Sequence, residues 1–428
     1  MNEYMNANES TLPIGFPMSA GPVSQSNAGE DAARRRSIAF LNWAHAIDHF
    51  VLLIYPTVVI GLETVYQRSY SELIALSSSA FVAFGVFSLP AGWLADRWSR
   101  RNMMTAFYIG CGLSLAGAGF APNLTSLGVA MFALGMFASI YHPVGMAMLI
   151  EASNARGRTL AFNGVCGNLG VSLAAGISAA LATWFGWRAA FYAPAGILIL
   201  TGIVYYLLTP DDLHHAKNRK SAPAVSLTPR LAVMLFGLFI VIALSAGLTF
   251  NVLTIALPKI VDERLSRDLP LVLVGSIATA VLVCGALAQL TVGRLVEWVS
   301  PHVIFAIVTG IGFVGNLWAA YASGVALLAA LAIAIAAIYG QVTVNDMIMA
   351  RYTADAWRGR VYAVRYFLLF ISAGAAIGMI SILHETGGFT LVLGVNAAIA
   401  LLLFVTTLAL VAMIISVEGK QRAPQPAE

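Results

Sequence analysis

The chain has 428 residues, of which 59% are hydrophobic and only 10% are charged, and its mean hydropathy is +0.82. Soluble domains carry roughly 25% charged residues, so this composition excludes an ordinary soluble protein and indicates a chain that lies in a bilayer. The net charge of +4 does not indicate nucleic-acid binding, because the basic residues stand in short segments between apolar runs. The three cysteines lie inside apolar runs, which predicts neither disulfides nor a thiolate metal site.

Twelve segments are apolar and long enough for a membrane helix, which needs about 20 residues. In the first half we expect them at 37–61, 72–95, 103–121, 124–150, 159–183 and 187–208. In the second half we expect them at 231–257, 271–296, 302–322, 325–350, 361–383 and 389–415. The domain plan is therefore a disordered tail (1–36), a six-helix half (37–208), a linker (209–230), a second six-helix half (231–415) and a short tail (416–428).

The basic residues predict the orientation of these helices. Placing the first tail in the cytoplasm puts 18 lysines and arginines on that side and five on the other. The five expected outside are Arg68, Arg188, Lys259, Arg264 and Arg267. The positive-inside rule then predicts a multi-pass protein of the cell's inner membrane with both termini, and the linker, in the cytoplasm.

Three sequence markers recur at nearly the same offset. Gly92-Trp93-Leu94-Ala95-Asp96 returns 201 residues later as Gly293-Arg294-Leu295-Val296-Glu297. Arg156-Gly157-Arg158 and Gly186-Trp187 return 202 residues later as Arg358-Gly359-Arg360 and Gly388-Phe389. This register indicates a duplicated half, and duplicated halves are the architecture of a large class of transporters.

The turn after the second helix resembles the signature loop of the major facilitator superfamily. The loop is matched at Gly92, Leu94, Asp96, Arg97, Arg100 and Arg101, and Ser99 stands where the family usually has a left-handed glycine. Glu151 and Arg158 resemble the partner motif that braces this turn, whereas the second half keeps Arg360 but has Thr353 in the glutamate position. The resemblance implies an all-α membrane fold of twelve helices in two six-helix halves, with a conformational latch made by Gly92, Asp96, Arg97, Arg100, Arg101, Glu151, Arg158, Glu297 and Arg360.

Within that superfamily, two stretches are similar to the fosmidomycin-resistance type of efflux protein. One is His45-Ala46-Ile47-Asp48-His49, followed by Pro56. The other is Tyr141-His142-Pro143, followed by Gly164, Gly167, Asn168 and Gly170. This similarity implies proton-coupled export of a small organic compound. Antiporters commonly carry a Gly-Pro pair in helix five, and here no proline follows Gly164 until after Trp187.

Ionisable groups inside a membrane span are costly, so each is a functional hypothesis. His45, Asp48 and His49 share a helix face near mid-depth, where a carboxylate beside imidazoles can hold a proton. The alternative is that these side chains only bond one another or a neighbouring helix. The candidates for proton coupling and for the cavity lining are His45, Asp48, His49, His142, Asn163, Asn168, Gln341, Asn345 and Arg365.

Several of these candidates keep two interpretations. His142 precedes Pro143, which should kink its helix, and it either lines a gate or is a satisfied core residue. Arg365, at the repeat position of Asn163, either binds an anion in the cavity or extends to the cytoplasmic surface. Asp346 stands near a helix end, where we expect a loop anchor.

The sequence has no phosphate-binding loop of the Gly-x-x-x-x-Gly-Lys-Ser/Thr kind, so ATP-driven transport has no support. We find no constellation of nucleophile or metal ligands and expect neither an enzyme nor a cofactor. The sequence predicts a monomeric secondary transporter that works by alternating access, with protons and a small molecule as partners, as an efflux antiporter. The alternatives are proton-coupled uptake of an organic anion, which Arg365 would favour, and a receptor or assembly factor that transports nothing.

Overall fold

The computed structural model describes residues 25–153, 156–209, 228–265, 268–353 and 355–422, and the regular secondary structure in these ranges is helical. The first half holds α1 (Gln25–Tyr66), α2 (Tyr70–Ala75), α3 (Ser78–Arg97), α4 (Arg100–Phe120), α5 (Leu124–Ala138), the π-helical turn η1 (Tyr141–Gly145), α6 (Met146–Ala152), α7 (Arg156–Phe185) and α8 (Ala189–Leu208). The second half holds α9 (Pro229–Arg264), α10 (Leu271–Leu295), α11 (Pro301–Tyr321), α12 (Gly324–Tyr352) and α13 (Asp355–Arg422).

Eleven stretches of the described chain are long and apolar enough to cross a membrane. The last of them, Phe367–Ser416, has 50 residues, and α13 is kinked within it at Gly388, whose φ is 60°. A single crossing needs about 20 residues, so α13 crosses twice and the total is twelve. This confirms the all-α class and the twelve membrane helices that the sequence predicted.

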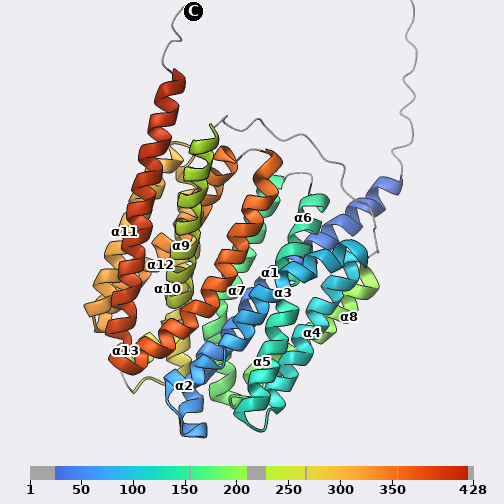
Figure 1. Ribbon diagram of the computed structural model, residues 1–428. Coiled ribbons are helices and arrows are strands. Elements are labelled where there is room, and N and C mark those ends of the chain that lie inside the picture. The colour runs from blue at the N-terminus through green and yellow to red at the C-terminus, as the bar shows by residue number, and fades with distance from the viewer. Residues whose placement is uncertain (1–24, 154–155, 210–227, 266–267, 354, 423–428) are drawn as a thin grey trace, which may run out of the picture.

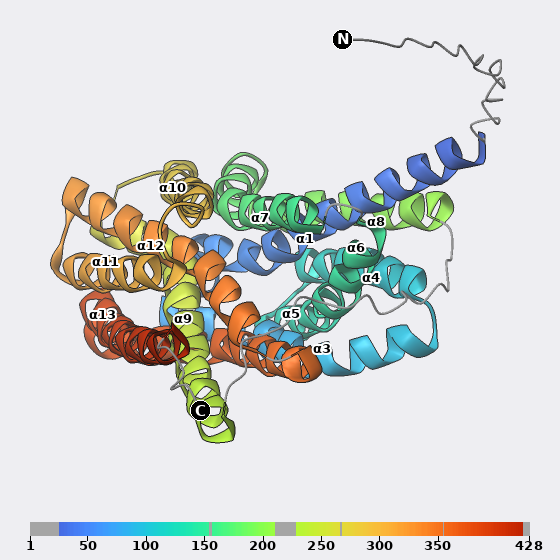
Figure 2. The same ribbon diagram turned by 90° about the horizontal axis from the view of Figure 1, so that it is seen from above.

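The helices form two groups that lie side by side, α1–α8 in one and α9–α13 in the other (Figures 1 and 2). The start of α1 and the end of α13 lie on the same face of the molecule, at the top of Figure 1. We call this the terminal face, and the face that carries α2 and the kink of α13 the opposite face. The linker of the domain plan falls largely outside the described residues. The first tail, 1–36, was expected to be disordered, but its residues from Gln25 on belong to α1, and residues 416–422 of the second tail belong to α13.

The first and fifth membrane helices, α1 and α7, pack closely against each other. A side chain at Gly170 of α7 would meet the backbone oxygen of Ala46, and one at Gly167 would meet the ring of His45. Only glycine lets two helices approach at this distance. The consequence is that the polar face of α1 lies directly against α7.

Several helix ends lie beyond the expected ones, at both ends of α1, at the end of α9 and at both ends of α13. The first helix was expected to end at 61 but runs to Tyr66, and the seventh was expected to end at 257 but α9 runs to Arg264. Lys259 therefore lies within a helix, buried, and not in a loop. The fourth segment is interrupted as Pro143 predicts, because the chain passes through the π-helical turn η1 between α5 and α6.

Candidate functional site

Four ionisable side chains meet where α1 passes η1. His45, Asp48 and His49 lie three and four residues apart and so share a face of α1, and η1 brings His142 against that face. The ring centroid of His142 is 5.6 Å from those of both His45 and His49, which are 5.0 Å apart. Two stretches that were separate candidates in the sequence therefore form one group.

Asp48 is the most buried member of this group, with none of its surface exposed. Its Oδ2 lies 3.2 Å from Nε2 of His142, and neither oxygen accepts a well-aligned hydrogen bond from the residues that the structure describes. An unpaired carboxylate at such a position is costly. A carboxyl group in this position can be neutralised by a bound proton or balanced by a positive charge on His142.

Asn163 of α7 fixes the orientation of His45. The imidazole donates its Nδ1–H to the backbone oxygen of Asn163 at 2.8 Å, since a carbonyl oxygen can only accept. The Asn163 side chain donates to Oδ1 of Asn42 at 3.0 Å and accepts from the Tyr141 hydroxyl at 3.1 Å. In its neutral form His45 therefore has Nε2 as its proton acceptor. The sequence analysis did not single out Asn42 or give Tyr141 a role.

One ring nitrogen from each of the three imidazoles lies within 4.8 Å of the other two, at half-buried positions. Among the described residues, only this set could supply three nitrogen ligands to one metal ion. Beside a carboxylate inside a membrane span, the same groups can hold and pass protons.

The second half contributes the other side of the group. Phe370 of α13 places its ring 5.2 Å from that of His142 and 4.6 Å from that of Phe84. The histidine group therefore lies at the boundary between the two halves. Gln341 and Asn345, one turn apart on α12, are buried, and their side-chain oxygens have no hydrogen-bond partner among the described residues. Their place in the cavity stays a prediction.

Arg365 corresponds to neither of its two expected roles. Its guanidinium is buried and forms an ion pair with Asp346 of α12. Asp346 was expected to anchor a loop, but it lies in the helix and balances this charge. The pair ties α13 to α12, and the positive charge is no longer available alone for an anion.

Asn168 connects the two halves. Its side-chain amide donates to Oε1 of Gln289 on α10, and the Gln289 amide donates to the Thr343 hydroxyl on α12 at 3.2 Å. A hydrogen bond between α7 and α10 joins helices from different halves. Asn168 therefore lies at the boundary, though its expected contact with a substrate is a prediction.

On the terminal face, Arg100 is the centre of the signature loop. Its guanidinium contacts Asp96 at 3.3 Å and Glu151 of α6, which matches the expected brace between the loop and the end of the fourth segment. Ser99 has an extended backbone with φ −165°, and its hydroxyl accepts from the amide of Asn102 at 3.2 Å. Serine replaces the family's glycine without strain because this turn uses it as a helix N-cap.

The other latch candidates are placed as follows. Gly92 packs against Pro143, Arg97 lies over the Trp93 ring at 4.0 Å, and Arg101 lies over the Tyr206 ring at 4.6 Å. Glu297 is exposed and forms no ion pair with any residue in the described ranges. The side chains of Arg158 and Arg360 lie outside the described part of the structure.

Sequence reasoning missed a polar cluster on the opposite face, where side chains from both halves meet. Its members are Glu63, Ser71, Lys259, Asp262, Glu263 and His384. The available signal was the run of charges at 259–264, which follows an apolar stretch closely enough to continue its helix.

Comparison with known proteins identifies the class of this architecture. The family model of the Major Facilitator Superfamily matches residues 38–364. The "Probable L-galactonate transporter" of Escherichia coli (strain K12) is 29% identical over 148 residues, which cover 34% of this chain and 33% of that protein. The "Multidrug resistance protein MdtG" of Rahnella sp. (strain Y9602) is 24% identical over 263 residues, which cover 58% of this chain and 62% of that protein.

The chain thus spans between a third and three fifths of the length of these two curated relatives. The fold is similar to a crystal structure of a bacterial homolog of the human lysosomal transporter Spinster in an inward-facing and unoccupied conformation. The TM-score is 0.69 at 13% identity, over 92% of this chain and 99% of that one. Because the family model covers most of the twelve-helix architecture, the chain belongs to the Major Facilitator Superfamily.

Proposed function

We propose that the protein is a secondary transporter of a small organic molecule, that it works by alternating access, and that it exports its substrate in exchange for protons. The observation that carries this proposal is the Asp48–His142 pair, a buried carboxylate against an imidazole at the boundary between the two halves. A group in this position can hold a proton on one side of the membrane and release it on the other, because the halves alternate in admitting water.

The proposed topology places the terminal face in the cytoplasm of the inner membrane. It is supported by the excess of arginine and lysine in the loops of that face, including the signature loop around Arg100. Twelve crossings also return the chain to the face where it begins. On this topology the opposite face is extracellular.

Export is the direction that we favour. One relative is named as a multidrug resistance protein, and the His45–His49 and Tyr141–Pro143 stretches are similar to fosmidomycin-resistance efflux proteins. The alternative, uptake of an organic anion, depended on an unbalanced charge at Arg365. Arg365 is paired with Asp346, and this is one reason why we favour export.

The first prediction tests the proton-coupling role directly. Asp48→Asn should abolish transport driven by a pH gradient, because the neutral amide is close in size but cannot exchange a proton. We would reconstitute the purified protein in liposomes that contain a pH-sensitive dye, and measure proton flux on addition of each compound in a panel. Asp31→Asn, an exposed carboxylate on the same helix, is the matched control and should retain full flux.

Proton flux at the wild-type level in Asp48→Asn would remove Asp48 from the mechanism. A protein that moves no proton with any compound, although it is folded and inserted, would favour the receptor alternative. Growth of a deletion strain on toxic compounds and on sole carbon sources separates the two directions, since loss of an exporter gives sensitivity and loss of an importer gives starvation.

A further inference from the structure

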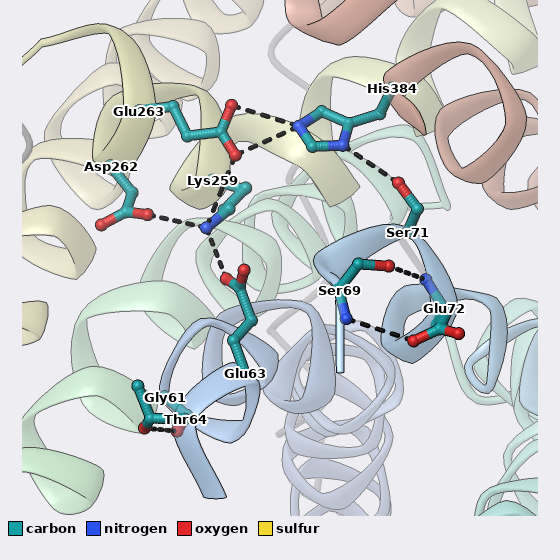
Figure 3. Close-up of polar contacts among 10 residues, drawn as sticks. All are labelled: Gly61, Glu63, Thr64, Ser69, Ser71, Glu72, Lys259, Asp262, Glu263 and His384. Carbon is teal, nitrogen blue, oxygen red and sulfur yellow. Dashed lines mark hydrogen bonds and ion pairs between the residues drawn. The ribbon is translucent and has the colours of Figure 1, made fainter. Parts of the chain in front are cut away.

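The polar cluster on the opposite face is built around one buried lysine (Figure 3). The Lys259 side chain is 7% exposed, and its ammonium group contacts Glu63, Asp262 at 3.0 Å and Glu263 at 3.5 Å. Asp262 and Glu263 belong to the same helix as Lys259, whereas Glu63 belongs to α1 in the other half. The Lys259–Glu63 contact therefore has to break when the halves separate on this face.

His384 of α13 adds a second connection between the halves. Its Nε2 lies 3.1 Å from both carboxylate oxygens of Glu263, and its Nδ1 lies 3.1 Å from the hydroxyl of Ser71 on α2. One turn before it, Ser381 donates to the backbone oxygen of Ser71 at 2.8 Å. Figure 1 shows α2 beside α13 at this face. We call these contacts of Glu63, Ser71, Lys259, Glu263, Ser381 and His384 the clamp.

The charges of the cluster do not balance when His384 is neutral. Three carboxylates, those of Glu63, Asp262 and Glu263, surround one ammonium group, that of Lys259. A proton on His384 supplies a second positive charge next to Glu263 and makes both ring nitrogens donors, to Glu263 and to Ser71. Of these two contacts only the one with Ser71 crosses between the halves, whereas the Glu263 contact lies within the second half. The added positive charge also offsets the carboxylates of the second half that face Glu63 of the first, so protonation favours the closed arrangement.

The other groups around His384 do not compensate for this charge. The rings of Tyr70 and Phe389 lie 5.1 Å and 4.6 Å from it. Arg68 pairs with Glu72 at the surface, and Arg264 donates to backbone oxygens of α11. Of the groups that face the clamp, only the histidine belongs to a residue type whose charge ordinarily changes between about pH 5 and 8.

Water can reach the clamp from the opposite face. A cavity of about 490 Å³ lies beside the clamp and is lined by Asp262, Glu263, Arg264 and residues 387–390. Glu263 is thus shared between the cavity wall and the bond to His384. Water in this cavity can therefore reach the carboxylate that contacts His384, and the His384 side chain is itself 15% exposed.

We propose that His384 is a proton-binding site in the clamp, and that a proton bound there holds the halves closed on the opposite face. Acid on this side favours closure and neutral or basic solution favours opening. The inference rests on the alternating-access part of the proposed function, but not on the substrate, the direction of transport or the role of Asp48.

The test measures the distance between the halves without any substrate. Spin labels would be attached to Thr125→Cys of α5 and Tyr321→Cys of α11, which are exposed on the opposite face, after Cys111, Cys166 and Cys284 are replaced by alanine. Electron spin resonance then gives the fractions with a short and a long distance. We expect the long-distance fraction to rise several-fold between about pH 5 and 8.

Two pairs of variants separate the parts of the proposal. His384→Asn keeps a polar side chain but does not titrate, so its long-distance fraction should be high at both pH values, whereas His302→Asn on α11 should keep the wild-type pH dependence. Glu63→Gln should raise the long-distance fraction roughly tenfold, as expected for the loss of one charge-assisted hydrogen bond between the halves. Asp262→Asn removes a Lys259 contact within one half and should change that fraction much less.

The outcomes distinguish this inference from the proposed function. An unchanged pH dependence in His384→Asn would overturn the proton site, even if Glu63→Gln opens the clamp. A single short distance in every variant and at every pH would overturn the clamp. Proton-coupled flux through liposomes with an intact Asp48 would then still support the proposed function.

Discussion

A buried charge in a membrane protein is either neutralised by a proton or balanced by an opposite charge, and Asp48 and Arg365 illustrate the two cases. Asp48 lies against the imidazole of His142, and in the proposed mechanism its charge is neutralised by an exchangeable proton. Arg365 has the carboxylate of Asp346, so its charge is balanced permanently. At the scale of single residues, the first arrangement is suited to coupling and the second to structure.

The second prediction follows from this contrast. Asp346→Asn leaves the buried guanidinium of Arg365 without its carboxylate and should destabilise the protein by about 1–3 kcal/mol, discounted because the Asp346 side chain is 44% exposed. The double variant Asp346→Asn/Arg365→Gln should recover most of this loss. Thermal unfolding in detergent compares the stability of the wild type with that of Asp346→Asn, Arg365→Gln and the double variant. A double variant as unstable as the sum of the single ones would show that the two residues do not act as a pair.

The spacing of residues on one helix could be predicted from the sequence, but contacts between helices could not. The face shared by His45, Asp48 and His49 follows from the helical period. The contact between His142 and Asp48 depends on the path of the chain through η1. The contact between Lys259 and Glu63 joins positions that are 196 residues apart. From hydropathy alone, the charge of Lys259 predicts that the membrane helix ends before it. In the folded chain a partner from the other half balances it, so the helix continues.

At the scale of helices and turns, the repeat predicted from the sequence is visible in the backbone. Gly186 and Gly388, which are related by the repeat, both have a positive φ, of 86° and 60°. Each stands at the opposite face, where one helix ends and the next begins. Glycine adopts this conformation without the steric penalty that other residues meet. The duplicated Gly-aromatic pair therefore marks the same turn in both halves.

The third prediction concerns that turn. Gly388→Ala should destabilise the protein by about 1–2 kcal/mol, because alanine is strained at a left-handed φ. Gly378→Ala is the matched control: this glycine lies in the same helix α13, and a Cβ there would meet no other atom within 4 Å. Alanine at 378 should be neutral or slightly stabilising, since it favours helix. The melting temperatures of the two variants decide the question, and equal values would contradict the role given to Gly388.

At the scale of the whole molecule, the structure combines a closed clamp on the opposite face with an exposed signature loop on the terminal face. The Asp96 side chain is 67% exposed and contacts Arg100 of its own half at 3.3 Å. Among the side chains that the structure describes, none from the second half forms a hydrogen bond or ion pair with Asp96. An alternating-access protein that is closed on one face admits water on the other. The structure therefore corresponds, in the proposed topology, to a state closed to the outside.

The fourth prediction is that Asp96 forms its contact with the second half only in the other state. By the repeat symmetry, its partner is the start of α13, where free backbone amides carry about half a positive charge. A carboxylate at that point stabilises the closed terminal face by about 0.3–1 kcal/mol. Asp96→Asn should then favour the state that is open on the terminal face, by up to about fivefold.

Labels at Leu208→Cys of α8 and Trp298→Cys, after α10, report the distance between the halves on the terminal face, where both positions are exposed. Asp96→Asn should increase the long-distance fraction there and decrease it on the opposite face, since alternating access couples the two. Asp31→Asn should change neither. A loss of folded protein with unchanged distances would mean that the loop only anchors the topology. A change on the terminal face alone would mean that the latch and the clamp are not parts of one equilibrium.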